Sequence, residues 1–183
     1  MRVIAGTHRG RRLRTVAGLN VRPTSDRLRE TLFNIVAGRI HDSRVLDICA
    51  GSGAVAIEAL SRGAREATFI ERSRQAVAVI EANLQSLALK GTIINRDAFA
   101  SLKRLEQEGK QFDIVFFDPP YASQIYVDVM KYLGSGNLVA ADVIVIVEHR
   151  AKTPPDPQFG KLRSFREIKQ GESALSFYEI SSS

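Results

Sequence analysis

Short apolar segments alternate with segments of helical periodicity along most of this chain, and this alternation limits the fold more than any other feature. A strand, a helix and a second strand form a right-handed crossover, which makes the strands parallel and leaves helices on both faces of the sheet. The segments predict an α/β fold of the Rossmann-like type, with strands at 45–48, 67–71, 92–95, 112–117 and 143–147 and helices at 55–61, 74–89, 102–109 and 126–133.

The two ends of the chain depart from this alternation. Residues 165–169 and 175–180 alternate apolar and polar side chains around a turn, which predicts a C-terminal antiparallel hairpin after a proline-rich loop at 153–160. Before the first strand, apolar residues at helical spacing predict a helix that ends near Ile40, with Thr24, Ser25 and Asp26 as candidate N-caps. We divide the chain into an arm at 1–23 and one domain with an N-terminal helix at 24–183.

The positive charge of the chain is confined to its first quarter. Residues 1–44 hold ten arginines and three acidic residues, a balance of +7, whereas residues 45–183 are close to neutral and the whole chain carries +6. Arginine binds phosphate in a bidentate manner. We expect a nucleic-acid interface, although the helical arginines could instead form a solvent-facing surface. Its candidate residues are Arg9, Arg11, Arg12, Arg22, Arg27 and Arg29.

The composition argues against membrane-spanning, disulfide-bonded and metal-binding proteins. No segment approaches the roughly 18 apolar residues of a membrane span, and the single cysteine, Cys49, excludes a disulfide within the chain. His8, His41 and His149 are scattered, so we expect no metal site. These features favour a cytoplasmic protein, which we expect to be a monomer.

Acidic residues and glycines follow the predicted parallel strands, at the edge where ligands bind in such sheets. Asp47 ends the first strand before Gly51 and Gly53, Glu71 ends the second, and Asp97 follows the third. The glycine spacing also fits a dinucleotide-binding loop, which keeps a nicotinamide enzyme as an alternative. However, Asp47 would repel a pyrophosphate and would suit the cationic methionine end of S-adenosylmethionine. Glu71 could accept hydrogen bonds from ribose hydroxyls, and Asp97 could meet an adenine amino group.

The most specific segment is Asp118-Pro119-Pro120-Tyr121, directly after the apolar strand at 112–117. An exocyclic amine of a base is a weak nucleophile. Asp118 and the Pro119 carbonyl could accept its two N–H groups and direct its lone pair toward a methyl donor. The prolines restrict the loop, and Tyr121 could stack on the base. We therefore predict catalysis of amine methylation by these four residues, with Asp118 also touching the cofactor.

These residues resemble the class I methyltransferases with an Asp-Pro-Pro-Tyr motif. The arginine-rich segments at 9–13 and 22–34, the glycine loop at 50–53, residues 57–64 and, more loosely, Gly171 and residues 176–178 are similar to the RsmD family. The resemblance implies a seven-stranded sheet and an S-adenosylmethionine site formed by Asp47, Gly51, Gly53, Glu71, Asp97 and Asp118. It also implies methylation of guanine N2 in small-subunit ribosomal RNA. Ala56 and Cys49 depart from the family pattern without removing a polar contact.

Other functions remain open at this point. The amine chemistry would also serve a DNA methyltransferase acting on adenine N6 or cytosine, and a binding module could keep a vestigial cofactor site. Cytosine C5 methylation normally needs a thiolate, and the place of Cys49 in the cofactor loop argues against that role. Residues 148–150 end the fifth strand and could line the substrate cleft.

Overall fold

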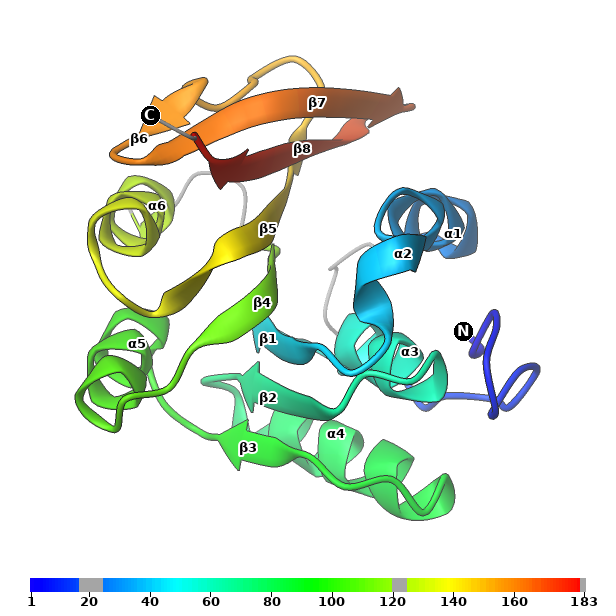
Figure 1. Ribbon diagram of the computed structural model, residues 1–183. Coiled ribbons are helices and arrows are strands. Elements are labelled where there is room, and N and C mark those ends of the chain that lie inside the picture. The colour runs from blue at the N-terminus through cyan, green and yellow to red at the C-terminus, as the bar shows by residue number, and fades with distance from the viewer. Residues whose placement is uncertain (17–24, 120–124, 182–183) are drawn as a thin grey trace.

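The computed structural model describes residues 1–16, 25–119 and 125–181 and contains one mixed sheet with the strand order β3-β2-β1-β4-β5-β8-β7-β6 (Figure 1). Its strands are β1 Arg44–Ile48, β2 Glu66–Ile70, β3 Thr92–Ile94, β4 Phe112–Phe117, β5 Val139–Arg150, β6 Gln158–Phe159, β7 Leu162–Gln170 and β8 Ser173–Ile180. Its helices are α1 Asp26–Ile35, α2 Ala37–Ile40, α3 Ala54–Ser61, α4 Arg74–Ser86, α5 Ala98–Gln107 and α6 Ile125–Ser135.

The pairing of the strands confirms the predicted mixture of directions. Strands β1 to β5 pair in parallel, whereas β8 runs antiparallel to both β5 and β7. In the described part of the chain the sheet has eight strands rather than seven, because β6 lies within the predicted loop and pairs with the start of β7. A strand of two residues carries no periodicity, so its existence depends on this pairing alone.

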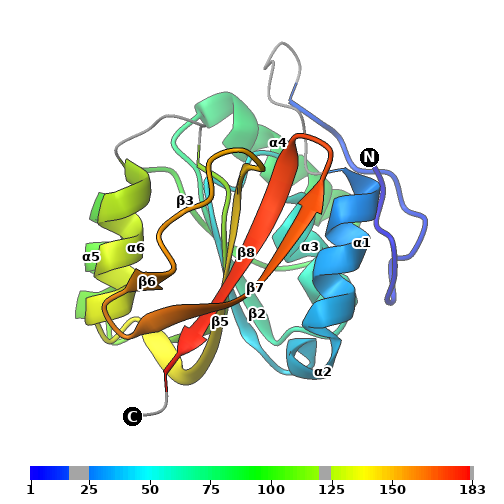
Figure 2. The same cartoon turned by 90° about the horizontal axis from the view of Figure 1, so that it is seen from above.

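Helices cover both faces of the sheet (Figures 1 and 2). Helices α1 to α4 lie on one face and enclose a core that includes Leu32, Ile57 and Phe116. Helices α5 and α6 lie on the other face, over a core that includes Leu102 and Val115. We call these the α1–α4 face and the α5–α6 face. Alternate residues of each strand supply the two cores, as the pleat of a strand requires.

The predicted N-terminal helix consists of two helices. Ser25 caps α1, since its hydroxyl oxygen accepts a hydrogen bond from the Leu28 N–H at 3.1 Å. Val36 then leaves helical geometry, with φ −95° and ψ 9°, between α1 and α2. Across residues 1–16, 25–119 and 125–181, no helix has both the length and the apolar character needed to cross a membrane.

Candidate active site and nucleic-acid interface

The carboxyl ends of β1 and β4 bring two of the predicted acidic residues onto one face. Val45 and Phe116 point into the α1–α4 core, so Asp47 and Asp118, each two residues further along, lie on that same face. Asp118 continues the pairing of β4, because its N–H donates to the Ile48 carbonyl at 3.3 Å. These two residues are separated by 71 positions in the sequence and lie at the ends of neighbouring strands.

The glycine loop between β1 and α3 has the geometry of a close backbone approach to a ligand. Gly51 and Gly53 have φ angles of 55° and 75°, which other residues adopt at a cost in strain. A Cβ on Gly53 would lie 3.0 Å from the Phe69 ring and 3.2 Å from Ile80, so packing also requires this glycine. A Cβ on Gly51 would meet no atom of the described structure within 4 Å, which leaves room beside that backbone.

Asp47 caps the start of α3 from within the core. It is 2% exposed, and its carboxylate accepts a hydrogen bond from the Ala56 N–H at 3.3 Å. Burial raises its pKa to about 7, and the nearby charge of Glu71 adds to the shift. Ala56, the departure noted from the family pattern, is fully buried and keeps this backbone contact.

Glu71 and Asp97 both bond to backbone N–H groups at the sheet edge. The Glu71 carboxylate accepts from Gly51 at 2.9 Å and from Ser73 at 2.8 Å, which ties the glycine loop to the start of α4. Asp97 is exposed and is the N-cap of α5, accepting from the Ala100 N–H at 3.1 Å. A carboxylate has about four acceptor positions, so both retain capacity for a ligand.

Asp118 is partly buried and has acidic neighbours. Burial raises its pKa well above the usual value, and the charges of Glu148 and Asp47 raise it further. Glu148 lies within β5, is 2% exposed, and shares the α1–α4 face because Ile144 and Ile146 point into that core. Pro119 is buried directly after Asp118. Pro120 and Tyr121 lie outside the described residues.

Cys49 is unsuited to nucleophilic chemistry. Burial raises the pKa of its thiol to about 12, and the charges of Glu71 and Asp118 act in the same direction. The thiolate, rather than the thiol, is the nucleophile. Cytosine C5 methylation through Cys49 is therefore disfavoured by the environment of the residue as well as by its place in the sequence.

Residues 1–14 form a compact N-terminal hairpin. The Val3 N–H donates to the Arg11 carbonyl and the Gly10 N–H to the Val3 carbonyl, both at 2.9 Å, while Arg2 and Arg12 form an antiparallel bridge. Figures 1 and 2 show this dark blue segment beside α1. The side chains of Arg9, Arg11 and Arg12 are exposed on it.

The hairpin is attached to α3 by buried polar groups that sequence reasoning did not identify. Glu58 is fully buried and accepts hydrogen bonds from the N–H groups of Ile4 at 2.7 Å and Ala5 at 2.9 Å. The Ser61 carbonyl accepts from Thr7 at 2.8 Å. Both residues fall within the segment 57–64 that resembles the family, which is the one signal that could have identified them.

Arg29 corrects one prediction about the interface. The sequence placed it on a solvent-facing helical surface with Arg27, but its side chain is fully buried. It donates to the Arg2 carbonyl and, at 3.1 Å, to the Asp26 carboxylate, so it supports the hairpin from beneath. Burial lowers its pKa despite the nearby charges of Glu58 and Asp26. Arg27 is exposed as predicted, and Arg22 lies outside the described residues.

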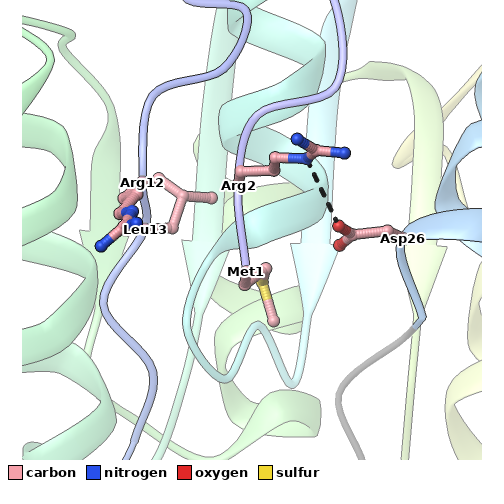
Figure 3. A pocket seen from close by; sticks show the side chains of 5 residues that line it. All are labelled: Met1, Arg2, Arg12, Leu13 and Asp26. Atoms are coloured by element: carbon pink, nitrogen blue, oxygen red, sulfur yellow. Dashed lines mark ion pairs between the residues drawn. The ribbon is translucent and has the colours of Figure 1, made fainter.

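A hollow of about 430 Å³ opens between the hairpin and the start of α1 (Figure 3). Figure 3 shows Arg2 pointing toward Asp26, with 3.9 Å between the Arg2 Nε and the Asp26 carboxylate. Both side chains are largely exposed, so this ion pair contributes little and can open for a competing anion. The hollow is lined by Met1, Arg2, Arg12, Leu13 and Asp26.

Comparison with known proteins gives consistent matches over nearly the whole chain. A family model described as Conserved hypothetical protein 95 matches residues 1–179. Ribosomal RNA small subunit methyltransferase D of Escherichia coli K12 is 36% identical over 182 residues, which cover 98% of this chain and 89% of that protein. The protein of that name from Haemophilus influenzae is 36% identical over 157 residues, covering 84% and 81%.

A solved structure is similar to this chain over its whole length. The Escherichia coli protein yhhF has a TM-score of 0.87 and 34% identity, covering 100% of this chain and 99% of that one. The matches extend from the N-terminal hairpin into β8, so they include the glycine loop, Asp118 and the residues that hold the hairpin. The chain belongs to the family described as Conserved hypothetical protein 95, which is the RsmD family.

Proposed function

We propose that this protein transfers a methyl group from S-adenosylmethionine to the exocyclic N2 amine of a guanine in small-subunit ribosomal RNA. The observation that carries the proposal is the position of Asp118, which directly follows β4, on the same face as the buried Asp47 and beside the start of the glycine loop. Membership of a family whose relatives are named Ribosomal RNA small subunit methyltransferase D supports the choice of substrate.

The residues at the sheet edge fit the cofactor. The open space beside Gly51 would admit it, and the Asp47 carboxylate would attract its cationic methionine end. Glu71 would bind the ribose hydroxyls and Asp97 the adenine amino group, while Gly53 holds the loop against Phe69. When bound, S-adenosylmethionine supplies a methyl group that is already activated for transfer. The protein therefore needs mainly to position the acceptor.

Asp118 and the Pro119 carbonyl would accept the two N–H groups of the guanine amine, which directs the nitrogen lone pair at the methyl carbon. As the amine takes up the methyl group, Asp118 would accept the one N–H proton that the nitrogen loses. The raised pKa of Asp118 makes its ionised form a better proton acceptor than an ordinary carboxylate. Pro120 would restrict the loop and Tyr121 would stack on the guanine.

The arginines of the N-terminal quarter would hold the RNA backbone around the flipped guanine. Arg9, Arg11, Arg12 and Arg27 are exposed and are available to phosphates, and we include Arg22 from the sequence. Arg29 would act indirectly, because it fixes the hairpin that carries the first three. We propose that the arm at 1–23 binds RNA, that the domain at 24–183 performs catalysis, and that the protein acts as a cytoplasmic monomer.

The test is transfer of a tritiated methyl group to small-subunit RNA, to small-subunit particles that lack the modification, and to duplex DNA, with the product identified by mass. We expect label as N2-methylguanine in RNA or particles. Asp118→Asn should lower kcat by about 10²–10³-fold, the range for losing one group that stabilises developing charge. Asp113→Asn is the matched control, because Asp113 lies on the same strand and instead binds Arg44 at 2.7 Å.

Each alternative has its own outcome. Label in DNA alone would replace the RNA substrate with a DNA substrate. Binding of S-adenosylhomocysteine and RNA without label in any substrate would favour the binding module, and preferential binding of NADH would favour a nicotinamide enzyme.

A further inference from the structure

One buried amide joins the N-terminal hairpin to the glycine loop. Asn83 lies on α4 and is 1% exposed. Its side-chain oxygen accepts from the Arg14 N–H at 2.8 Å, and its side-chain nitrogen donates to the carbonyls of Arg14 and Ser52, both at 3.1 Å. Both N–H donors and one acceptor position are therefore used, which fixes the orientation of the amide.

The two partners of Asn83 belong to different parts of the proposed site. Ser52 lies between Gly51 and Gly53, in the loop where the cofactor would approach. Arg14 ends the hairpin that carries Arg9, Arg11 and Arg12. Asn83 contacts both the N–H and the carbonyl of Arg14, so it holds the backbone of the hairpin and does not depend on the arginine side chain.

A second contact joins the same two segments. The Ser52 hydroxyl donates to the Met1 sulfur at 3.7 Å, so the hairpin meets the glycine loop from its first residue as well as from Arg14. The hairpin is otherwise attached to elements behind the loop: Glu58 and Ser61 hold it on α3, and the Arg11 guanidinium donates to the Ser86 carbonyl at 3.0 Å on α4. A shift of the hairpin would therefore act on Ser52 by two routes: through Asn83, which bonds to the Ser52 backbone, and through Met1, which contacts only the Ser52 side chain.

We propose that Asn83 is a positioning residue that couples RNA binding at the hairpin to cofactor binding at the glycine loop. This inference rests on the proposed function, since it takes RNA as the ligand of the hairpin and S-adenosylmethionine as the ligand of the loop. RNA that fixes the hairpin also fixes Ser52, and a cofactor that orders the loop also orders Arg14. Thermodynamic linkage requires the two effects to be equal.

The experiment measures the Kd of S-adenosylhomocysteine by calorimetry, with and without saturating small-subunit ribosomal RNA. For the wild-type protein we expect RNA to tighten binding by about 5- to 150-fold, the usual range of coupling between two sites. In Asn83→Ala this factor should fall well below the wild-type factor, since only the weaker contact between Met1 and Ser52 then joins the hairpin to the loop. Gln85→Ala removes an exposed amide from the same helix and should keep the wild-type factor.

A second pair of variants tests the same coupling in case Asn83→Ala does not fold. Arg14→Pro removes the backbone N–H that Asn83 accepts, while Arg14→Ala removes the same side chain and keeps that N–H. Coupling should fall in Arg14→Pro and remain in Arg14→Ala. A merely structural role for Asn83 would lower the unfolding temperature without changing the ratio of the two Kd values.

The inference is overturned if the wild-type factor is one, or if Asn83→Ala and Arg14→Pro keep the wild-type factor. These results are independent of turnover, because only binding is measured. Methyl transfer to RNA without coupling would leave the proposed function standing and remove the role of Asn83. Coupling without methyl transfer to any small-subunit substrate would support the role of Asn83 and contradict the proposed reaction.

Discussion

The two faces of the sheet bury different kinds of polar group. On the α5–α6 face, three buried polar side chains are neutral and hydrogen-bonded: the Ser101 hydroxyl donates to the Asp97 carbonyl at 2.7 Å, and His149 bonds to Ser176 at 2.8 Å. Burial lowers the pKa of His149, which keeps its ring neutral. Among the described residues, the α1–α4 face instead buries three carboxyl groups and a guanidinium, those of Asp47, Glu58, Glu148 and Arg29.

This difference separates stability from function. An ionisable group buried away from water costs free energy unless it is paired or neutralised. Glu58 is compensated by its hydrogen bonds to the hairpin, and Arg29 is compensated in part, because its Nε and Nη1 have no hydrogen-bond partner among the described residues. Asp47 and Glu148 lie beside Asp118 and leave acidic groups close together. We infer that packing on the α5–α6 face serves mainly to stabilise the fold. On the α1–α4 face, burial of the acidic groups of the site lowers the stability of the fold.

The largest expected effect tests the α5–α6 face. Leu102 is fully buried on α5, and Leu102→Ala should lower the free energy of unfolding by about 2–5 kcal/mol through the lost contacts and the cavity left behind. Urea unfolding measures the change, and kcat well below the unfolding temperature should stay at the wild-type value. A fall in kcat of the folded variant would show that this face also shapes the site.

A smaller effect, the change of cofactor affinity with pH, tests the α1–α4 face. Because the pKa of Asp47 is about 7, its carboxylate is mostly protonated at pH 6 and ionised at pH 8. Affinity for S-adenosylmethionine should rise about tenfold between these values, as a cationic ligand favours the ionised form. Calorimetry at the two values measures the change, and Asp47→Asn should bind weakly with little pH dependence.

The raised pKa of Asp47 makes stability fall with rising pH, whereas it makes the affinity for S-adenosylmethionine rise. The folded state holds the Asp47 proton up to about pH 7, whereas the unfolded state releases it near 3.8, so this residue makes folding less favourable as pH rises from about 4 to 7. Asp47→Asn should therefore unfold at a higher temperature than the wild-type protein at pH 8. Equal unfolding temperatures at pH 8 would contradict the assigned pKa.

The smallest expected effect on the free energy of unfolding concerns an exposed ion pair outside both cores, which provides a reference for the larger effects. Arg104 and Glu108 form an exposed ion pair at 2.7 Å on α5. Arg104→Ala should change the free energy of unfolding by about 0.5 kcal/mol or less, because solvent screens such pairs. A loss above about 1 kcal/mol by urea unfolding would show that surface charge on this face matters more than the comparison allows.

The sequence was informative where function depends on residues close together in the chain. Asp47 lies near the end of β1 with Gly51 and Gly53 in the loop directly after it, and Asp118 follows an apolar strand. Local pattern and the topology of parallel strands therefore predicted their place at one sheet edge. The order of helices and strands was likewise predicted, except for the break at Val36 and the short β6.

The parts that could not be predicted depend on distant contacts. Glu58 meets Ile4 across 54 positions and Asn83 meets Arg14 across 69, and neither pairing leaves a periodic signal. Arg29 was misplaced for a related reason: an arginine on a helix usually faces water, and its burial here depends on the Arg2 carbonyl and on the carboxylates of Glu58 and Asp26. Helical spacing alone does not reveal such partners.

The antiparallel pairing of β5 and β8 has a consequence for synthesis of the protein. β5 is twelve residues long, and until β8 has left the ribosome one edge of β5 exposes unpaired backbone groups. Such an edge is a template for association between nascent chains. In the finished sheet the outermost strands, β3 and β6, have only three and two residues. Messages truncated shortly after residue 150 should therefore yield aggregates, whereas the complete chain should not.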